Sequence, residues 1–354
     1  MLDYKKIFSL EPFSLSKKNK DNWYFSSQKK LSKYHYKNCK EYKMITDRVF
    51  KDINACKKLS ELPFVHTKIF KEFNLKSVKI SSLTKTLVSS GTSNQILSQI
   101  NIDRKTSLLQ SRALLNIFSS IVKEKVTIFF LANPSTLTGE SSLSAKGAAI
   151  RGFSQLSKNS VYLLDKKNNL KIGRLEKFLK INPEEKFIIF GFTSLVWFSL
   201  INKMNEKKIQ IKENLGILIH GGGWKKLKDE AVSRNVFNNN VAKTLGIKNI
   251  YNYYGMVEQT GSVFLECEFG YFHTSVFSDV YIRDHNLNLA KNKNQGLIQV
   301  LSLLPLSYPG HNILTEDLGM IMGEDNCKCG RQGKFFSVMG RVPGTELRGC
   351  SDVY

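Results

Sequence analysis

This sequence has few of the features that indicate a disulfide scaffold, a signal peptide or a membrane helix. Six cysteines, at positions 39, 56, 267, 327, 329 and 350, are too few in 354 residues for a disulfide scaffold. The N-terminal MLDYKKIFSLEPF lacks the continuous apolar stretch of a signal peptide. The longest apolar run, Phe187–Ile201, is shorter than the run of about 20 residues that a membrane helix needs. We therefore expect a cytoplasmic protein without a transmembrane segment.

Negative charge is also in the minority. Asp and Glu total 30 against 53 Lys and Arg, so the formal net charge is +23. Such an excess favours an anionic partner, for example a nucleic acid, a membrane surface or a nucleotide. The basic residues are spread along the chain, however, and no helix-turn-helix, RNA-binding aromatic signature or zinc-finger spacing accompanies them. We expect no nucleic-acid partner.

The apolar pattern that is present predicts an α/β fold. Apolar runs at 126–131, 187–191, 215–220 and 250–255 alternate with segments of helical spacing, among them 111–123 and about 227–245. This alternation implies crossover units and a mostly parallel sheet flanked by helices. After about residue 260, short alternating segments such as GSVFLECE and GLIQVLSLL indicate a smaller, antiparallel β-rich part. We expect three regions: a helical N-terminal region (1–75), an α/β core (76–260) and a β-rich C-terminal part (261–354).

A hydroxyl-rich turn, LVSSGTSNQ, follows a short extended stretch. Backbone N–H groups around a glycine can form a nest for anions, and hydroxyl groups add donors. The turn matches neither the GxxxxGK[ST] loop nor the GxGxxG fingerprint, so an ordinary Ser/Thr/Gly turn is the better explanation of this motif taken alone. Its candidate phosphate-binding residues are Ser89, Ser90, Gly91, Thr92 and Ser93.

Two further motifs stand at the expected carboxyl ends of parallel strands, where open α/β sheets bind ligands. In HGGGW, the glycines Gly221, Gly222 and Gly223 would let a flat ligand approach the backbone closely. HGGG also resembles the oxyanion segment of lipase-type hydrolases, but the GxSxG nucleophile elbow that this class requires occurs nowhere in the chain. The hydrolase interpretation is therefore dropped.

Acidic and basic residues near the later motifs suit a nucleotide. In YYGMVEQTG, Glu258 follows Tyr254 by four residues; such a carboxylate can hold Mg²⁺ and such a tyrosine can stack on a base. A surface glutamate after a strand is the alternative. Asp317 in TEDLG can accept hydrogen bonds from ribose hydroxyls, and Arg341 in VMGRVPG can reach phosphate or ribose oxygens.

Four soft ligands form a separate group. Cys267 and His273 in CEFGYFH, with Cys327 and Cys329 in CKCG, offer three sulfurs and one imidazole. A CxC pair is too close for an easy disulfide, but its thiolates can share one zinc ion, and structural zinc is tetrahedral. Unligated cysteines in β-turns and a strand histidine are the alternative, so structural Zn²⁺ is one of two interpretations.

The ordered set SSGT, HGGGW, YGMVEQ, TEDLG and GR resembles the adenylate-forming superfamily. Together with CKCGR and RGCSD, it is most similar to the acyl-protein synthetase (LuxE) family of bacterial fatty-acid reductase systems. The resemblance covers about residues 80–354. It implies the N-terminal-domain fold of the superfamily and a long-chain-fatty-acid–protein ligase. Such an enzyme uses ATP and Mg²⁺ to convert a fatty or related carboxylic acid into an acyl-adenylate.

The resemblance also implies roles for single residues. In the family, the acyl group passes from the adenylate to a cysteine near the C-terminus and then to a partner acyl reductase; Cys350 matches that cysteine by position. The nucleotide roles fall on Ser89 to Ser93 for the phosphates, Gly221 to Gly223 for adenine or the acyl chain, Tyr254 with Gly255 for stacking on adenine, Glu258 for Mg²⁺, and Asp317 with Arg341 for the ribose.

The sequence departs from the superfamily pattern in three places. The phosphate loop lacks the usual lysine, and Val257 replaces the usual threonine before the magnesium glutamate. The chain ends shortly after Arg341, so the C-terminal lid domain of acid–CoA ligases is expected to be missing. Lys225 or Lys226, beside the glycines, could supply the missing positive charge. Two other functions stay open. The missing lysine and Val257 keep open a non-catalytic remnant of the fold. An AMP-forming acid–CoA ligase of the phenylacetate-ligase kind is the other alternative, and the missing lid domain argues against it.

Overall fold

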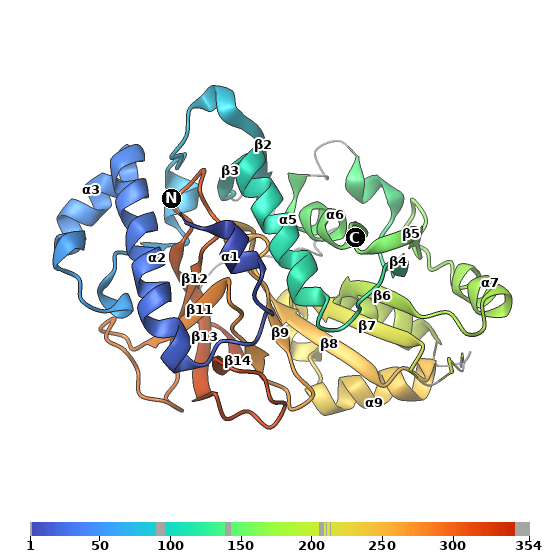
Figure 1. The fold of residues 1–354 in the computed structure, drawn as a ribbon. Helices are drawn as coiled ribbons and strands as arrows, with labels where there is room; N and C mark the ends of the chain where they lie inside the picture. The colour runs from blue at the N-terminus through green and yellow to red at the C-terminus, as the bar shows by residue number, and fades with distance from the viewer. Residues whose placement is uncertain are drawn as a thin grey trace. The chain divides into compact units, whose positions relative to one another are not determined.

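The chain forms two compact units that interleave along the sequence (Figure 1). The computed structural model describes residues 2–89, 96–138, 143–204, 209, 211–212 and 214–343. The first unit takes its described residues from 2–89, 96–120 and 255–343, and the second from within 121–254. The division at residues 75 and 260 stays a prediction. Within the described ranges, no helix is both long and apolar enough to cross a membrane.

The second unit contains a parallel sheet with the strand order β8–β7–β6–β4–β5. Every residue of β4, β6 and β7 is buried, which explains why these strands appear in the sequence as continuous apolar runs rather than as alternating ones. The strands are β4 (Val126–Phe130), β5 (Ser157–Tyr162), β6 (Phe187–Phe192), β7 (Gly216–Gly221) and β8 (Asn249–Tyr254).

Helices of the second unit pack against this sheet through apolar stripes. Helix α9 buries Phe237, Val241 and Leu245, spaced four residues apart on one face, in the same core as Leu218 of β7. A single long helix was expected over about 227–245; instead Ser233 caps a new helix start by accepting a hydrogen bond from the N–H of Val236. The helical elements are η4 (Pro134–Leu137), α6 (Ala145–Ser154), α7 (Gly173–Ile181), α8 (Thr193–Leu195), the π-helical η6 (Val196–Ile201), η7 (Asn202–Met204), η8 (Lys225–Glu230) and α9 (Arg234–Leu245).

The first unit contains antiparallel strands in the order β11–β12–β13–β14–β10–β9, and β1 pairs with β13 in parallel. The expected α/β fold, a mostly parallel sheet with helices followed by a β-rich part, is therefore confirmed. The strands are β1 (Val65–His66), β9 (Phe264–Glu266), β10 (Phe272–His273), β11 (Ser278–Arg283), β12 (Gly296–Ser302), β13 (Asn312–Glu324) and β14 (Lys334–Arg341), with the separate hairpin β2 (Leu83–Val88) and β3 (Gln99–Asp103).

Polar side chains are buried between the helices and strands of the first unit. Lys20, Gln28 and His35 lie on the inner face of the long helix α2, and each is at most 4% exposed. Such groups are tolerated in a core only with partners. Nζ of Lys20 donates to the carbonyl of Ser278 at 2.7 Å, the side chain of Gln28 donates to the carbonyl of Ser302 at 3.0 Å, and Nδ1 of His35 lies 2.8 Å from the hydroxyl of Ser77. The helical elements are α1 (Tyr4–Phe8), α2 (Lys17–Asn38), α3 (Lys40–Val49), η1 (Ile53–Ala55), η2 (Leu59–Glu61), α4 (Ile69–Glu72), η3 (Ile80–Ser82), α5 (Arg104–Phe118) and η9 (Val257–Gln259).

Candidate functional site

The glycine turn after β7 has a backbone that only glycine adopts easily. Gly222 and Gly223 have φ angles of 82° and 63°, in the left-handed region. A Cβ atom at Gly223 would have no described atom within 4 Å, so this part of the turn faces open space. Gly221 is required for a different reason, because a Cβ atom there would lie 2.6 Å from the ring of Tyr253. The turn therefore combines one packed glycine with two that leave the backbone accessible.

Successive tyrosines of β8 have opposite surroundings. Tyr253 is buried, and its ring stacks on Phe190 with 6.1 Å between centroids and contacts Phe153 at 5.7 Å. Tyr254 points to the other face of the strand and is half-buried. Tyr253 is thus a core residue, whereas Tyr254, the tyrosine assigned to adenine, keeps an accessible surface.

A hydrogen-bonded pair links the end of β6 to the glycine turn. The hydroxyl of Thr193 donates to the carbonyl oxygen of Gly221 at 3.1 Å and lies 2.9 Å from Nδ1 of His220. Because the single hydroxyl hydrogen is used by the carbonyl, Nδ1 of His220 is the donor in the second contact. Burial, with a smaller contribution from Arg234, lowers the pKa of His220 to about 3, so the ring is neutral. Sequence reasoning missed Thr193, although its place directly after a strand was a usable signal.

The phosphate-loop candidates are described only at the base of the loop. Ser89 is 6% exposed; its N–H donates to the carbonyl of Ser98 at 3.0 Å, and its hydroxyl accepts from the N–H of Ser98 at 2.9 Å. These two hydrogen bonds continue the β2–β3 pairing by one step. Ser90, Gly91, Thr92 and Ser93 lie outside the described residues, as does Cys350. Lys225 begins the 3₁₀ helix η8, and the description does not include its side chain.

Glu258 lies in the 3₁₀ turn η9 of the first unit and is 3% exposed. The hydroxyl of Tyr308 donates to its backbone carbonyl at 2.9 Å. The side chain of Gln259 donates to the carbonyls of Val300 and Gly310 at 3.1 and 2.8 Å. The turn is therefore fixed at Glu258 and at the residue that follows it. A rigidly held carboxylate supplies the hard oxygen ligand that Mg²⁺ prefers.

Asp317 and Arg341 are brought together by strand register. They are directly opposite in the β13–β14 ladder, and Nε of Arg341 donates to Oδ1 of Asp317 at 3.3 Å. The side chains are 16% and 26% exposed, respectively, so both retain accessible surface. The N–H of Asp317 also donates to the hydroxyl of Thr315 at 3.1 Å, which fixes the aspartate backbone. A carboxylate and a guanidinium side by side present acceptors and donors that suit vicinal hydroxyl groups.

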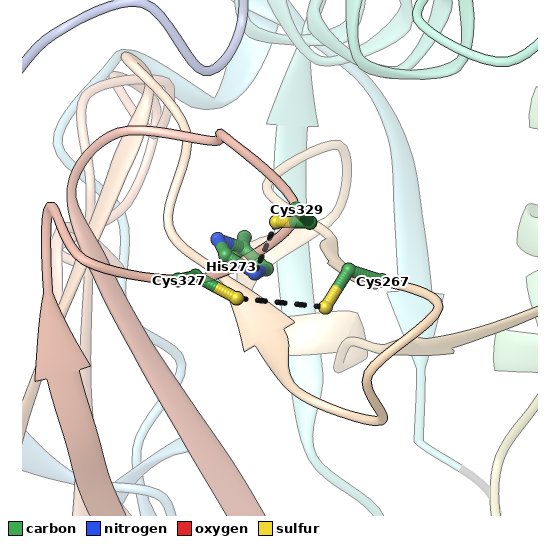
Figure 2. A group of neighbouring side chains, drawn as sticks. All are labelled: Cys267, His273, Cys327 and Cys329. Carbon is green, nitrogen blue, oxygen red and sulfur yellow. Dashed lines mark hydrogen bonds between the residues drawn. The ribbon is translucent and has the colours of Figure 1, made fainter.

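The four candidate zinc ligands also lie together in the first unit (Figure 2). Their ligand atoms all lie within 4.8 Å of one another. Cys267, His273 and Cys327 are buried, and Cys329 is partly buried. The sequence suggested the group, and the hairpins β9–β10 and β13–β14 bring its halves together because β10 pairs with β14.

Comparisons with known proteins give a family and a fold. The family described as "Acyl-protein synthetase, LuxE" matches residues 2–354. No curated protein matches the chain. Among solved structures, 2-hydroxyisobutyryl-CoA ligase in an open conformation, in complex with 2-HIB-AMP and CoA, shares 15% identity over 94% of this chain and 77% of that one, with a TM-score of 0.72.

Two further structures extend this likeness. The same ligase in its thioesterification state shares 14% identity over 95% of this chain and 71% of that one, with a TM-score of 0.71. ATP-bound MatB from Rhodopseudomonas palustris shares 11% identity over 75% of this chain and 49% of that one, with a TM-score of 0.50. At these identities the similarity shows a common fold.

Proposed function

The chain belongs to the LuxE family of acyl-protein synthetases, and we propose that it activates a fatty or related carboxylic acid with ATP and then binds the acyl group on Cys350. The family match over residues 2–354 carries the proposal. The fold shared with AMP-forming ligases supports it. Delivery of the acyl group to a partner acyl reductase is the final step of the proposal.

The chemistry requires two displacements. A carboxylate oxygen attacks the α-phosphorus of ATP, the bond to pyrophosphate breaks, and the product is an acyl-adenylate. The thiolate of Cys350 then attacks the acyl carbon, the bond to AMP breaks, and a thioester forms. A free thiol with a pKa of about 8.5 is a few per cent thiolate at neutral pH, so the second displacement is chemically accessible.

Residues of the first unit fit the nucleotide by their chemistry. Asp317 and Arg341 would hold the ribose hydroxyls with the paired acceptor and donor that their register creates. Glu258, on its fixed turn, would bind Mg²⁺. When bound, Mg²⁺ supplies charge neutralisation at the phosphate oxygens. The role of Glu258 is to hold the ion at a constant place without reorganisation of the turn.

Residues of the second unit fit a flat ligand. Gly222 and Gly223 would bring accessible backbone against adenine or the acyl chain, and Tyr254 would stack on adenine beside Gly255. Lys225 would supply the positive charge that the phosphate loop Ser89–Ser93 lacks. If Lys225→Ala retains the full rate of adenylation, this role of Lys225 is excluded.

The decisive experiment separates the two displacements. Cys350→Ser should retain ATP–pyrophosphate exchange with the preferred acid but lose all hydroxylamine-sensitive labelling by radioactive fatty acid. Cys56→Ser changes a buried cysteine of the first unit and should retain both activities. Labelling that persists in Cys350→Ser would exclude Cys350 as the acceptor. No exchange by the wild type with a panel of acids would favour the non-catalytic remnant.

A conventional acid–CoA ligase is the second candidate function. It is favoured by the fold similarity to a ligase whose structure contains CoA, at a TM-score of 0.72. Under this alternative, CoA added to the exchange mixture would be consumed and acyl-CoA would accumulate. The protein-ligase proposal predicts no acyl-CoA and a labelled polypeptide instead.

Ribose binding by Asp317 gives a quantitative test. Hydrogen bonds to a charged group contribute about 1.5–3 kcal/mol each, so Asp317→Ala should lower kcat/KM for ATP by about 10- to 150-fold. Asp21→Ala, which removes an exposed carboxylate of the same unit, should leave it unchanged. Equal kinetics for the two variants would remove Asp317 from the site.

A further inference from the structure

Cys267, His273, Cys327 and Cys329 come from two neighbouring turns of the first unit (Figure 2). Cys267 and His273 flank the turn between β9 and β10, and Cys327 and Cys329 lie in the loop between β13 and β14. Because β10 pairs with both β9 and β14, the two turns lie side by side. Three thiols and an imidazole therefore lie together, and the proposed adenylation chemistry uses none of them.

Two distances among these ligand atoms are close to those around a single tetrahedral ion. Sγ of Cys267 lies 3.9 Å from Sγ of Cys327, and Sγ of Cys329 lies 3.4 Å from Nε2 of His273. A tetrahedral Zn²⁺ ion with bonds of about 2.3 Å to sulfur and about 2.0 Å to nitrogen separates its ligand atoms by about 3.5–3.8 Å. A disulfide would need the two sulfur atoms at about 2.05 Å. The observed spacing fits shared coordination better than a covalent bond.

His273 is buried in a way that leaves its ring under-satisfied. It is 0% exposed, and its Nδ1 atom has no hydrogen-bond partner within the described part of the chain. Phe335 stacks on the ring with 5.6 Å between centroids. Nε2, the other ring nitrogen, faces Sγ of Cys329 and is the atom placed to bind a metal ion. A thiol is only a weak hydrogen-bond partner for a buried imidazole, and a metal ion on Nε2 would replace it.

A cationic side chain lies beside this group. Nη1 of Arg331 donates to the carbonyls of Leu265 at 3.2 Å and Glu266 at 3.4 Å, directly before Cys267 in the chain. Three thiolates with one Zn²⁺ carry a net charge of minus one, and the Arg331 guanidinium is a nearby positive charge. A bound metal would deprotonate these thiols outright.

We propose that these four residues bind one Zn²⁺ ion as a structural site. All four coordination positions come from the protein, which is the arrangement of a structural rather than a catalytic zinc ion. The ion would tie the β9–β10 turn to the β13–β14 loop. The N-terminal segment contacts the same two loops. The ring of Phe13 packs edge-on against His273 with 6.3 Å between centroids, and the carbonyl of Phe13 accepts a hydrogen bond from the N–H of Gln332 at 3.0 Å.

Metal analysis of the full chain, purified without added metal or chelator, tests the proposal directly. One zinc ion per chain is expected, released when an organomercurial titrates the thiols and detected with a zinc-sensitive dye. Co²⁺ exchanged into the site should give the absorption bands of tetrahedral thiolate coordination. A zinc-free protein with all thiols reactive would overturn the proposal. So would a zinc-free protein with two fewer thiols, which would indicate a Cys267–Cys327 disulfide.

Variants locate the ion. Cys267→Ser and Cys327→Ser should each lose zinc, whereas Cys39→Ser, at another buried cysteine of the same unit, should retain it. Because a ligand variant can fail to fold, the wild type stripped by a strong chelator provides a second measurement. Hydrogen exchange should then accelerate in residues 265–273 and 325–335, return to its former rate when Zn²⁺ is restored, and stay unchanged in β6 and β7. Zinc retained by both ligand variants, or exchange unaffected by stripping, would contradict the site.

The zinc inference does not depend on the proposed function. A protein that contains zinc but shows no pyrophosphate exchange would refute the adenylation proposal alone. A protein that exchanges pyrophosphate but contains no zinc would refute the metal site alone.

Discussion

The two units bury their interiors by different means. In the second unit, the strands β4, β6 and β7 are buried at every position and are almost entirely apolar, and the helices add more apolar side chains to the same core. In the first unit, charged and hydrogen-bonding side chains lie among the apolar ones. The stability of the apolar core depends on the volume and shape of its side chains. The stability of the core with polar side chains depends on the presence of each hydrogen-bond or ion-pair partner.

Asp279 illustrates the second type. Its carboxylate lies 3.7 Å from Nζ of Lys20 and 3.0 Å from Nζ of Lys334, and its side chain is 5% exposed. Burial alone would raise the pKa of Asp279, but the two lysines hold it below its usual value. One carboxylate is thus the counter-ion of two ammonium groups, one on α2 and one on β14.

A chain of hydrogen bonds provides a further example. Arg283 of β11 donates to the side chain of Gln299 in β12, and Gln299 donates to Oδ1 of Asn312 in β13 at 2.6 Å. Asn312 in turn donates to the carbonyl of Pro63 at 3.1 Å. Three adjacent strands and the segment before β1 are joined through side chains that have no solvent to replace a lost partner.

The largest effect is expected from Asp279→Ala. It leaves two buried ammonium groups without their counter-ion, so the free energy of unfolding should fall by about 3–5 kcal/mol. Urea denaturation followed by circular dichroism measures this, with Asp21→Ala, at an exposed position on α2, as the control. If both variants unfold at the same urea concentration, the buried ion group does not stabilise the first unit, and the contrast between the units fails.

An exchange of similar volume should be costly in one unit and mild in the other. Gln299→Met leaves Arg283 and Asn312 without their buried partner. Each such group costs about 1–3 kcal/mol, so a loss of about 2–6 kcal/mol is expected for the two. Leu218→Met, at a fully buried position of β7, should cost less than about 1.5 kcal/mol. Thermal and urea unfolding of the two variants give the comparison, and the reverse order would contradict it.

Acid should weaken the chain more gradually, through its buried histidines. Burial lowers the pKa of His35 in the first unit and of His220 in the second to about 3, and that of His311 well below its usual value. These rings stay neutral when folded but take up a proton in the unfolded chain at a pKa of about 6.5. Stability is therefore present above about pH 6.5 and is lost as pH falls toward about 3, by about 1.4 kcal/mol per pH unit for each histidine.

Urea midpoints between pH 7 and 5 measure this slope. His311, which stacks on His35 with 4.7 Å between centroids, is one of the buried histidines of the first unit. His311→Asn should therefore reduce the loss of stability by about 1.4 kcal/mol per pH unit, the contribution of one histidine. Fluorescence of a Trp23→Phe variant reports only on Trp197 and Trp224, which belong to the second unit. A slope unchanged by His311→Asn would show that this ring takes up its proton in the folded chain at the same pH as in the unfolded chain.

The sequence predicts the apolar strands of the second unit better than the pairings of the first. The apolar strands of the second unit were predicted to within a residue or two, because a strand buried on both faces has a local signature in the sequence. The start of α5 was missed. The helix begins at Arg104, seven residues before the expected start at 111, because Asp103 caps it by accepting a hydrogen bond from the N–H of Thr106. Caps and turns depend on single side chains rather than on periodicity.

Pairings across the β-rich part could not be predicted in the same way. Asp317 and Arg341 were both named from motifs, but only the β13–β14 register makes them partners. The same holds for Asp279 with its two lysines, which no spacing in the sequence connects. Thr193 was missed because its partner, His220, lies on the neighbouring strand. Register and strand order are properties of the whole chain, so the local sequence carries little of this information.

The reciprocal hydrogen bonds between Ser89 and Ser98 have a practical consequence for engineering. They extend the pairing of β2 and β3 by one step through two serines. If the turn binds the triphosphate as proposed, the stretch between these serines could be exchanged for that of another member of the family, as a cassette, to alter phosphate binding while the two hydrogen bonds are kept.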